Sequence, residues 1–327
     1  MAMRMSRIVA LVILLLTIAA PSAVHAGGPP IDLQKDVNRD GIPDALVVEV
    51  DRIARSSDQM AAIASFVSRL PYSPRTRALQ QEAERLQAQM AGVKSDEEAR
   101  QILEKLRALS DEMMADPNYA RTVQSLMVLL APPNVRKEGD LLIKSEGAVS
   151  TASVNWSSLR RGDIMLVRSG LWDWFMFIYA MWYSHAGNYD GNGLVYESNT
   201  DGVRLKPLSK WQQPGQYIGL GRDNKRSAAE VQAAMDWAKG FYGTDGRTPY
   251  NYFYPDKWTD SRLYCSQLVW KIHKHIGVDL DSNAWEYQLW IAARWGWWAV
   301  AAVSIPAVAP DEIGLDGDVT FYSTGWN

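Results

Sequence analysis

The spacing of apolar residues predicts that the first half of the chain is helical. Helices are expected at residues 51–70, 76–90, 95–114 and 118–130. In the first of these, Met60 and Ile63 recur at helical spacing with the apolar residues that follow them. The third begins with Ser95 and Glu98, which form a capping-box signature. These segments predict a small helical bundle or hairpin over residues 51–135, and no catalytic pattern occurs in it.

The second half alternates strand and helix signals. Strands are expected at residues 162–167, 184–189, 194–198, 202–205 and 217–220, and helices at 227–242 and 265–276. Asp190-Gly191-Asn192-Gly193 separates the second and third strands, and these residue types favour a hairpin turn. Ser227 and Glu230 form another capping box, and Gly277 suits the position just after a helix. Residues 157–327 are therefore predicted to be an α+β domain with an antiparallel sheet.

Aromatic residues mark the boundary between these two regions. All 14 tryptophans lie from Trp156 onward, which indicates two differently built parts of the chain. The boundary is expected between Ala131 and Ser158, where Pro132-Pro133 and a polar stretch interrupt the periodic pattern. The predicted organisation is a helical module at 51–135, a linker at 136–156 and a second domain at 157–327.

The first 26 residues have the features of a secretory signal peptide. Arg4 and Arg7 precede an apolar run of 13 residues, which is too short to span a bilayer comfortably. Val24 and Ala26 then place small residues where signal peptidase requires them. Cleavage is expected after Ala26, and the protein is expected to be secreted or periplasmic. The alternative is an anchor that stays attached.

Composition and charge exclude several classes of protein. The chain has 327 residues, of which 47% are hydrophobic, so it has enough apolar material for one or two cores and is not disordered. Its single cysteine excludes an internal disulfide. A formal net charge of −3 leaves no basic footprint, so nucleic acid is not an expected partner.

The single cysteine, Cys265, is expected at the N-terminus of the helix at 265–276. The helix dipole and the unpaired N–H groups of the first turn stabilise a thiolate, which is the nucleophilic form of cysteine. In an exported protein an odd cysteine is either a free reactive thiol or part of an intermolecular disulfide. The third alternative is a small buried hydrophobic residue.

A thiol nucleophile needs a base, and the spacing favours His185. His273 and His275 lie roughly 12 to 15 Å along the helix axis from Cys265, and we expect them on the surface near the end of the helix. His185 begins a predicted strand and has small neighbours that leave room beside its ring.

The imidazole also needs a polar residue that orients it, and Glu197 on the returning strand is the first candidate. A three-residue turn at Asp190–Asn192 places Glu197 directly opposite His185. A two-residue turn at Gly191-Asn192 turns Glu197 to the other face of the sheet. Asn199 is then the alternative orienting residue.

Four short motifs, taken in order, resemble those of a known family. They are Gly162-Asp163-Ile164, Tyr183-Ser184-His185-Ala186-Gly187, Tyr196-Glu197-Ser198 and Tyr264-Cys265-Ser266-Gln267-Leu268-Val269-Trp270. They are similar to the motif series of the permuted papain-like NlpC-type superfamily, in its YiiX/YebB-like branch, where the histidine strand precedes the cysteine helix. The resemblance covers residues 157–315, and Pro310-Asp311-Glu312-Ile313 resembles the closing segment of the family.

This resemblance implies a circularly permuted papain-like fold and a cysteine amidase or peptidase. It implies Cys265 as the nucleophile, His185 as the base and Glu197 as the third polar residue. Tyr183 and Tyr264 of the same motifs are expected to contact substrate, and no cofactor is expected for catalysis. The implied substrates contain amide or isopeptide bonds, and cell-wall peptides suit an exported chain. The alternatives are an acyl-lipid hydrolase or transferase with the same residues, and a non-catalytic surface-binding module.

Residues 27–50 contain a loop that resembles a calcium-binding sequence. Its oxygen-bearing residues are Asp36, Asn38, Asp40 and Asp44, with Gly41 where such loops turn sharply. The glutamate that completes an EF-hand is missing, so we expect a structural calcium site of a shorter kind. The alternative is an acidic turn that precedes a helix.

Tryptophans gather in two stretches, at residues 171–182 and 285–298. Some of them are expected in the core. Exposed members would line a substrate groove or contact a membrane surface or lipid. Asp173, Glu286 and Arg294 interrupt the stretches, so neither is expected to cross a membrane.

Overall fold

The computed structural model describes residues 28–90, 92–93, 95–132, 135, 154–168 and 179–327. The predicted signal peptide, most of the predicted linker, and Trp172 and Trp174 lie outside these residues. The chain forms two compact units. One combines Met1–Leu129 with Trp285–Pro306, and the other combines Leu130–Ala284 with Ala307–Asn327.

The first unit is helical, as the apolar spacing predicts. Its helices are α2 (Asp44–Ala54), α3 (Gln59–Ser68), α4 (Pro74–Met90), α5 (Asp96–Met113), α6 (Pro117–Leu129), α10 (Trp285–Trp295) and the π-helical turn η4 (Val300–Ser304). The hydroxyl of Ser95 caps α5 by accepting the N–H of Glu98, as predicted. The single helix predicted at 51–70 is wrong, because α2 ends at Ala54 and a new helix, α3, begins after Asp58. The side chain of Asp58 caps α3 by accepting the N–H of Ala61.

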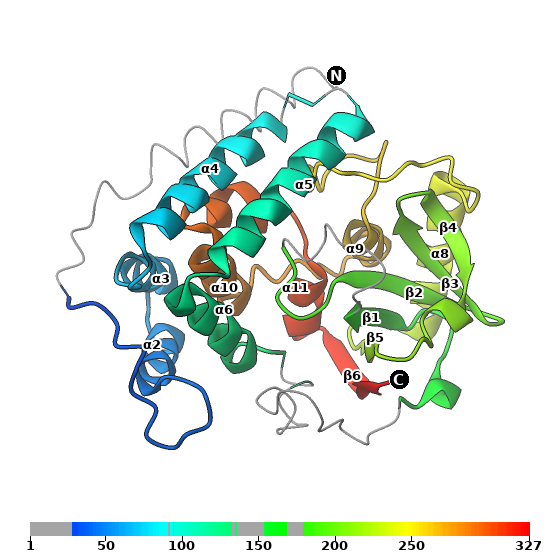
Figure 1. The fold of residues 1–327 in the computed structure, drawn as a ribbon. Coiled ribbons are helices and arrows are strands. Elements are labelled where there is room, and N and C mark those ends of the chain that lie inside the picture. Colours follow the sequence, from blue (N-terminus) through cyan, green and yellow to red (C-terminus); the bar gives the residue numbers. More distant parts are fainter. Residues whose placement is uncertain (1–27, 91, 94, 133–134, 136–153, 169–178) are drawn as a thin grey trace. The chain divides into compact units, whose positions relative to one another are not determined.

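Helix α10 belongs to this first unit, although it comes from the second half of the sequence. It packs against α3, α4 and α6, and Figure 1 shows it in orange among the blue and green N-terminal helices. The hydroxyl of Tyr72 donates to the carbonyl of Ala293, and that of Tyr119 to the carbonyl of Arg294, both at 3.1 Å. The predicted second domain at 157–327 stays a prediction, although its residues 285–306 pack with the N-terminal helices. A buried helix packs wherever an apolar surface matches it, whatever its place in the sequence.

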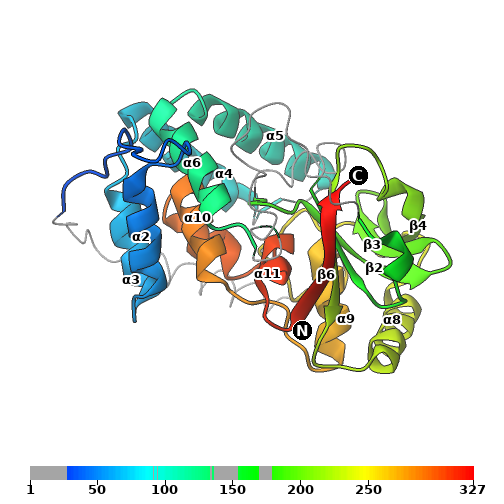
Figure 2. The same ribbon diagram turned by 90° about the horizontal axis from the view of Figure 1, so that it is seen from below.

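The second unit is built on one antiparallel sheet. Its strands are β1 (Ile164–Arg168), β2 (His185–Gly191), β3 (Leu194–Asn199), β4 (Gly202–Pro207), β5 (Tyr217–Asp223) and β6 (Val319–Trp326), in the order β4-β3-β2-β1-β5-β6. The first five confirm the predicted strands. Strand β6, shown in red in Figure 2, was not predicted and pairs with β5.

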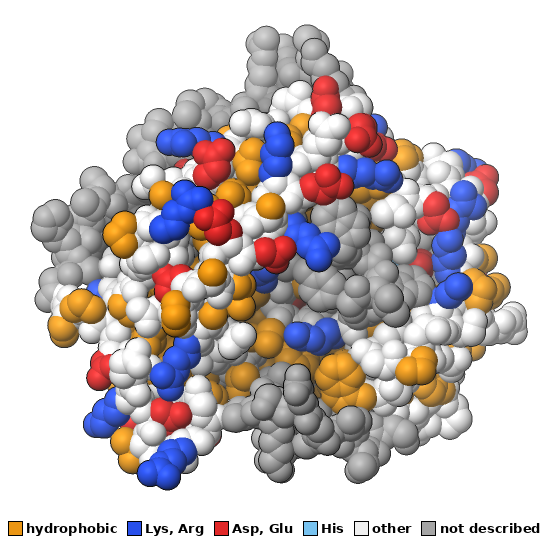
Figure 3. Space-filling view, in the orientation of Figure 1, with side chains coloured by type: hydrophobic (Ala, Val, Ile, Leu, Met, Phe, Trp, Pro, Cys, Tyr) orange, Lys and Arg blue, Asp and Glu red, His pale blue; other side chains and the backbone are white. Residues whose placement is uncertain are grey.

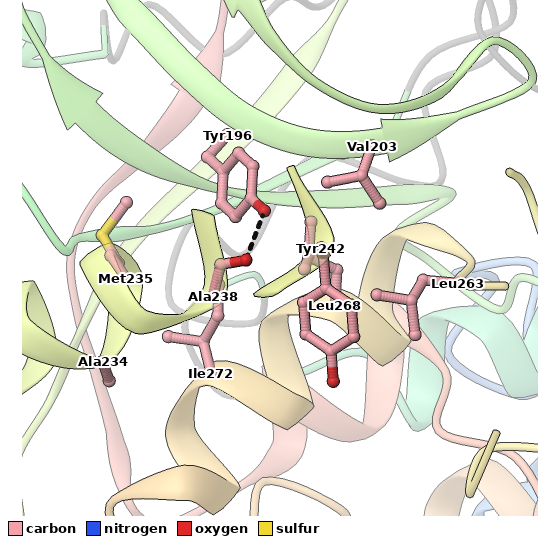
Figure 4. Close-up of a cluster of buried hydrophobic side chains, with 9 residues drawn as sticks. All are labelled: Tyr196, Val203, Ala234, Met235, Ala238, Tyr242, Leu263, Leu268 and Ile272. Carbon is pink, nitrogen blue, oxygen red and sulfur yellow. Dashed lines mark hydrogen bonds between the residues drawn. The ribbon is translucent and has the colours of Figure 1, made fainter. Parts of the chain in front are cut away.

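Helices α8 (Ala228–Tyr242) and α9 (Cys265–His275) pack together, and α9 contacts β2 and β3. Figure 4 shows the apolar cluster that they share with Tyr196 of β3 and Val203 of β4. The hydroxyl of Tyr196 donates to the carbonyl of Ala238 at 3.2 Å. A second cluster lies on the other face of the sheet and includes Val167, Val195 and Trp211.

The remaining elements are short. They are the 3₁₀ turns η1 (Trp156–Ser158) and η3 (Leu208–Lys210) and the helix α11 (Pro310–Leu315). The resemblance marked Pro310–Ile313 as a closing segment, and these residues form most of α11.

The hairpin between β2 and β3 differs from both predicted turns. Asn192 and Gly193 form a two-residue turn with φ of 52° and 71°, the positive values that such hairpin turns require. The register then shifts by one residue between Tyr189 and Gly191, because Asp190 forms a β-bulge. Asn188 therefore pairs with Tyr196. A bulge leaves little trace in sequence, so neither predicted turn contained it.

Candidate active site

Cys265 is the first residue of α9, as the sequence predicts. Gln267 fixes the start of this helix, because its side-chain oxygen accepts the N–H of Tyr264 at 3.1 Å. Its side-chain nitrogen donates to the carbonyls of Lys257 and Thr259 in the preceding loop, at 3.0 and 3.1 Å. The thiol is thus held at a helix N-terminus, where backbone N–H groups lack intrahelical acceptors.

Cys265 is a free cysteine, and its side chain is fully buried. Burial excludes an intermolecular disulfide unless the surrounding chain opens. Two interpretations remain, a reactive thiol and a small buried hydrophobic residue. A neighbouring base decides between them, because a catalytic cysteine needs one.

His185, Glu197 and Trp211 form a buried polar group on one face of the sheet. Nε2 of His185 lies 3.4 Å from Oε2 of Glu197, and all three side chains are at most 1% exposed. The indole N–H of Trp211 donates to the same carboxylate oxygen at 2.8 Å. The ring centres of Trp211 and His185 lie 5.3 Å apart. Continuing the observed register places Glu197 diagonal to His185 on the same face, which brings the two predicted residues together.

Trp211 was not predicted as part of this group. It is one of 14 tryptophans, and nothing in its neighbouring sequence distinguishes it from those in the core. It reaches His185 because the chain after β4 crosses the sheet toward β5.

The packing of α9 on β2 places the first residues of both elements at the same end. The side-chain nitrogen of Asn188 lies 3.4 Å from Nε2 of His273. From this contact, three strand residues lead back to His185, over about 10 Å. Eight helix residues lead back to Cys265, over about 12 Å. A second contact gives the relative direction of the two elements, because the hydroxyl of Ser198, on β3 beside the start of β2, donates to the carbonyl of Leu263 at 2.5 Å, two residues before Cys265. His185 and Cys265 therefore begin their elements at the same end of this pair.

Their side chains are not in hydrogen-bond contact. His185 and Asn188 are three residues apart on a strand, so their side chains point to opposite faces. Asn188 faces α9, and the imidazole of His185 faces Trp211. Within the described residues no hydrogen bond joins the Cys265 thiol to the imidazole. A contact between them has to form around the end of β2.

The structure corrects the predicted position of His273. This residue is fully buried, and its Nδ1 lies 2.9 Å from the carboxylate of Asp223. Burial raises the pKa of Asp223, but hydrogen bonds from His273 and from the N–H groups of Lys225 and Arg226 outweigh burial and hold the pKa below its usual value. His275 is exposed, as predicted, and stacks on Trp237 with ring centres 3.8 Å apart.

Tyr183 and Tyr264, predicted to contact substrate, are both buried. The hydroxyl of Tyr264 accepts the N–H of Val308 at 3.0 Å. The ring of Tyr183 is nearly parallel to that of Phe321, with centres 6.5 Å apart. The structure gives both rings a packing role, and their contact with substrate stays a prediction.

The loop of the predicted calcium site uses its oxygen atoms locally. Asp36 accepts the N–H of Gly41 at 2.9 Å, and the side chain of Asn38 donates to Asp40 at 2.8 Å. Asp44 is the first residue of α2 and accepts the N–H of Val37. No group of three or more His, Cys, Asp or Glu side chains that could hold a metal occurs in the part of the chain that the structure describes. Calcium binding here stays a prediction.

The tryptophans of residues 285–298 are buried or half-buried, and none of them is fully exposed. Trp290 and Trp295 are 1% exposed, and Trp285, Trp297 and Trp298 are half-buried. Trp182 of the other stretch is also buried. Among the described residues no helix is both long and apolar enough to cross a bilayer. Contact with a membrane surface stays a prediction.

On the face of the molecule drawn in Figure 3, Lys and Arg side chains lie between Asp and Glu side chains, and the coloured atoms form no continuous basic patch. A cavity of about 70 Å³ in the second unit is lined in part by Arg160, Arg222 and Arg226. None of the predicted catalytic residues lines this cavity. It therefore does not mark the proposed site.

Comparison with known proteins gives three findings. Residues 158–314 match a family model described as permuted papain-like amidase enzyme, YaeF/YiiX, C92 family. The chain is 29% identical over 76 residues to the uncharacterized protein YiiX of Escherichia coli strain K12. That match covers 22% of this chain and 35% of YiiX, so the chain spans about a third of the length of this relative.

The third finding is a solved structure, titled as the metalloprotein yiiX from Escherichia coli O157:H7. It is 22% identical, with a TM-score of 0.36, and the match covers 52% of this chain and 99% of that chain.

Proposed function

Because residues 158–314 belong to the permuted papain-like amidase family, we propose that the chain is a cysteine hydrolase that cleaves amide or isopeptide bonds. Cys265 is the nucleophile, His185 the base and Glu197 the residue that orients the imidazole. The observation that carries the proposal is the buried contact of 3.4 Å between His185 and Glu197, at the end of β2 where α9 begins with Cys265.

The chemistry follows from the positions of these atoms. Glu197 lies beside Nε2 of His185, which leaves Nδ1 as the nitrogen that takes the thiol proton. Sγ of Cys265 then attacks the carbonyl carbon, and N–H groups at the start of α9 stabilise the oxyanion. The C–N bond breaks as Nδ1 returns the proton to the leaving amine. Water then hydrolyses the thioester, which releases the acid and restores the thiol.

The mechanism requires the imidazole and the thiol to approach each other. In unliganded enzymes catalytic hydrogen bonds are often long, and they tighten when substrate binds. The proposal therefore includes a movement at the end of β2 that brings Nδ1 toward Sγ and opens the buried thiol to substrate.

The proposed substrate is a peptide of the cell wall, and the proposed location is outside the cytoplasm after cleavage at Ala26. Two features support this: the N-terminal sequence has the pattern of a signal peptide, and the family acts on amide bonds. The complete burial of Cys265 favours a second candidate, a non-catalytic binding module that keeps the fold as a scaffold.

Two measurements test the proposal. The first is iodoacetamide labelling of Cys265 against pH, followed by intact mass, in the wild type and in His185→Ala. Labelling at pH 6 that falls in His185→Ala, but not in the matched control His275→Ala, is expected. A thiol that stays inert, or that titrates at about 8.5 in all three proteins, supports the non-catalytic module.

The second measurement identifies the bond. Purified cell wall and lipid vesicles are incubated with the wild type and with Cys265→Ala, and the products are identified by mass. New amines and carboxylic acids from the cell wall, absent with Cys265→Ala, are expected. Release of fatty acid from vesicles alone would replace the amidase with an acyl-lipid hydrolase.

A further inference from the structure

The carboxylate of Asp311 binds the stretch of chain that leads into the histidine strand. It accepts three successive backbone N–H groups, those of Met181, Trp182 and Tyr183, at 2.7, 2.8 and 2.8 Å. Asp311 is fully buried. A carboxylate that accepts the N–H groups of three successive residues fixes both the path and the orientation of that backbone.

This bound stretch is continuous with the start of β2. The next residue, Ser184, donates its backbone N–H to the carbonyl of Val167 at 2.8 Å. His185 then pairs with Val167 in the sheet. Asp311 on one side and β1 on the other therefore hold the four residues that precede His185. Together they fix the position of the His185 backbone and so of its Cβ atom.

Among the described residues, Arg168 of β1 lowers the pKa of Asp311, and the charge of Asp311 in turn raises the pKa of Glu312, the next residue of α11. Burial raises the pKa of Asp311 to about 6, although its three N–H donors and Arg168 act to lower it. The guanidinium of Arg168 lies over the ring of Trp182, 4.6 Å from its centre. The anionic form of Asp311 can accept all three backbone N–H groups of residues 181–183, and protonation of one oxygen weakens these hydrogen bonds.

Helix α11 is itself anchored, so Asp311 is a fixed point. The hydroxyl of Ser282 donates to the carbonyl of Glu312 at 3.0 Å. The carboxylate of Glu312 accepts the N–H of Ala309 at 2.8 Å. Within the described chain the carboxylate of Glu312 makes no hydrogen bond to residues 181–183, which makes Glu312 a matched control for Asp311.

We infer that Asp311 is a positioning residue that holds the backbone before β2 and thereby fixes the point from which the His185 imidazole makes its proposed approach to Cys265. This inference rests on the proposed function, since it concerns the approach of the imidazole to the thiol. Asp311 takes no part in bond making, and it acts only through the backbone of residues 181–183.

The test compares Asp311→Asn with Glu312→Gln. The asparagine replaces one acceptor oxygen with a donor that opposes a backbone N–H, so at least one bond to the stretch is lost. Burial and the charge of Asp281 raise the pKa of Glu312 well above its usual value. Glutamine keeps a side-chain oxygen that can accept the N–H of Ala309, so it replaces Glu312 closely. We measure kcat, KM and the pH profile of Cys265 labelling, with melting temperature recorded for each protein.

Asp311→Asn is expected to lower kcat by about 100-fold with little change in KM, since a small misplacement of a catalytic group has an effect of that size. Its labelling at pH 6 falls to the rate of His185→Ala, and the double variant Asp311→Asn/His185→Ala labels no more slowly than either single variant. Glu312→Gln keeps the wild-type profile. A purely structural role of Asp311 predicts a lower melting temperature with the pH profile unchanged.

The outcomes separate this inference from the proposed function. If wild-type labelling does not depend on His185, both fail. If it depends on His185 and Asp311→Asn keeps the same dependence, only the positioning role is wrong.

A measurement on the wild type serves if Asp311→Asn does not fold. In protein labelled with ¹⁵N at tryptophan and histidine, the amide signal of Trp182 is followed against pH. It is expected to titrate at a pH of about 6, with the ring signals of His185 moving in the same step. Ring signals of His185 that stay fixed through the Trp182 transition would overturn the inference.

Discussion

The indole N–H of Trp211 and the imidazole of His185 share one oxygen of Glu197. The N–H of Trp211 donates to this oxygen at 2.8 Å, and Nε2 of His185 lies 3.4 Å from it. The other oxygen of Glu197 is buried without a hydrogen bond within the described chain. Trp211 therefore supplies the contact that fixes the carboxylate beside the imidazole.

Removing this donor is expected to loosen the carboxylate and leave the ring packing in place. Trp211→Phe keeps an aromatic ring beside His185 but removes the N–H. The value of kcat is expected to fall by about 10- to 150-fold, which corresponds to the roughly 1.5–3 kcal/mol of a hydrogen bond to a charged group. Steady-state hydrolysis measures the effect. Trp237→Phe, at the stack with His275, is the control, and an equal loss there would contradict the specific role.

Neutralising Glu197 is expected to separate activity from stability. Glu197→Gln removes the negative charge that stabilises a protonated His185, so kcat is expected to fall by about 100-fold. The same change removes a buried carboxylate that has one unpaired oxygen, so the melting temperature is expected to stay equal or rise. Kinetics and thermal unfolding of the same preparation measure both. Full activity in Glu197→Gln would move the orienting role to another residue such as Asn199.

The buried pair of Asp223 and His273 predicts a dependence of stability on pH. The pKa of Asp223 is held below its usual value in the folded protein, so its contribution is complete above the unfolded pKa of about 3.9. It is lost as the pH falls below that value through the folded pKa. Asp223→Asn replaces the carboxylate partner of a buried histidine with an amide, so the free energy of unfolding is expected to fall by about 1–3 kcal/mol at pH 7.

Urea unfolding at pH 7 and pH 3 measures this difference between wild type and variant. The difference is expected to shrink at pH 3, because the wild-type carboxylate then begins to take up a proton. Asp236→Asn, at an exposed carboxylate of the same unit, is expected to change stability far less. A difference that is equal at both pH values would show that the effect comes from packing alone.

The loop at Asp36–Asp44 predicts calcium binding of the weak, extracellular kind. One oxygen of Asp36 is buried and has no hydrogen-bond partner in the described residues, which leaves it available to a cation. Calorimetric titration is expected to show a dissociation constant of about 10⁻⁴ to 10⁻³ M. Asp40→Asn is expected to weaken it, and magnesium is the comparison ion. If calcium gives no heat and no rise in melting temperature, the acidic turn is the correct interpretation.

Local sequence determined most of the secondary structure of this protein. Ser95 and Ser227 cap the helices that their capping boxes predict, and Cys265 begins its helix as expected. Five of the six strands lie where alternation and turn residues predicted them. These features depend on a residue and its neighbours within a few positions, and propensity, capping and turn chemistry act over that range.

Tertiary structure decided which of these elements meet. A bulge at Asp190 sets the register that brings Glu197 beside His185, and the chain after β4 brings in Trp211. Helix α10 joins the N-terminal helices, and His273 is buried because β5 supplies Asp223. Each of these depends on the burial of surfaces far apart in the sequence, where many partners satisfy the same apolar pattern. Only the packed fold selects one of them.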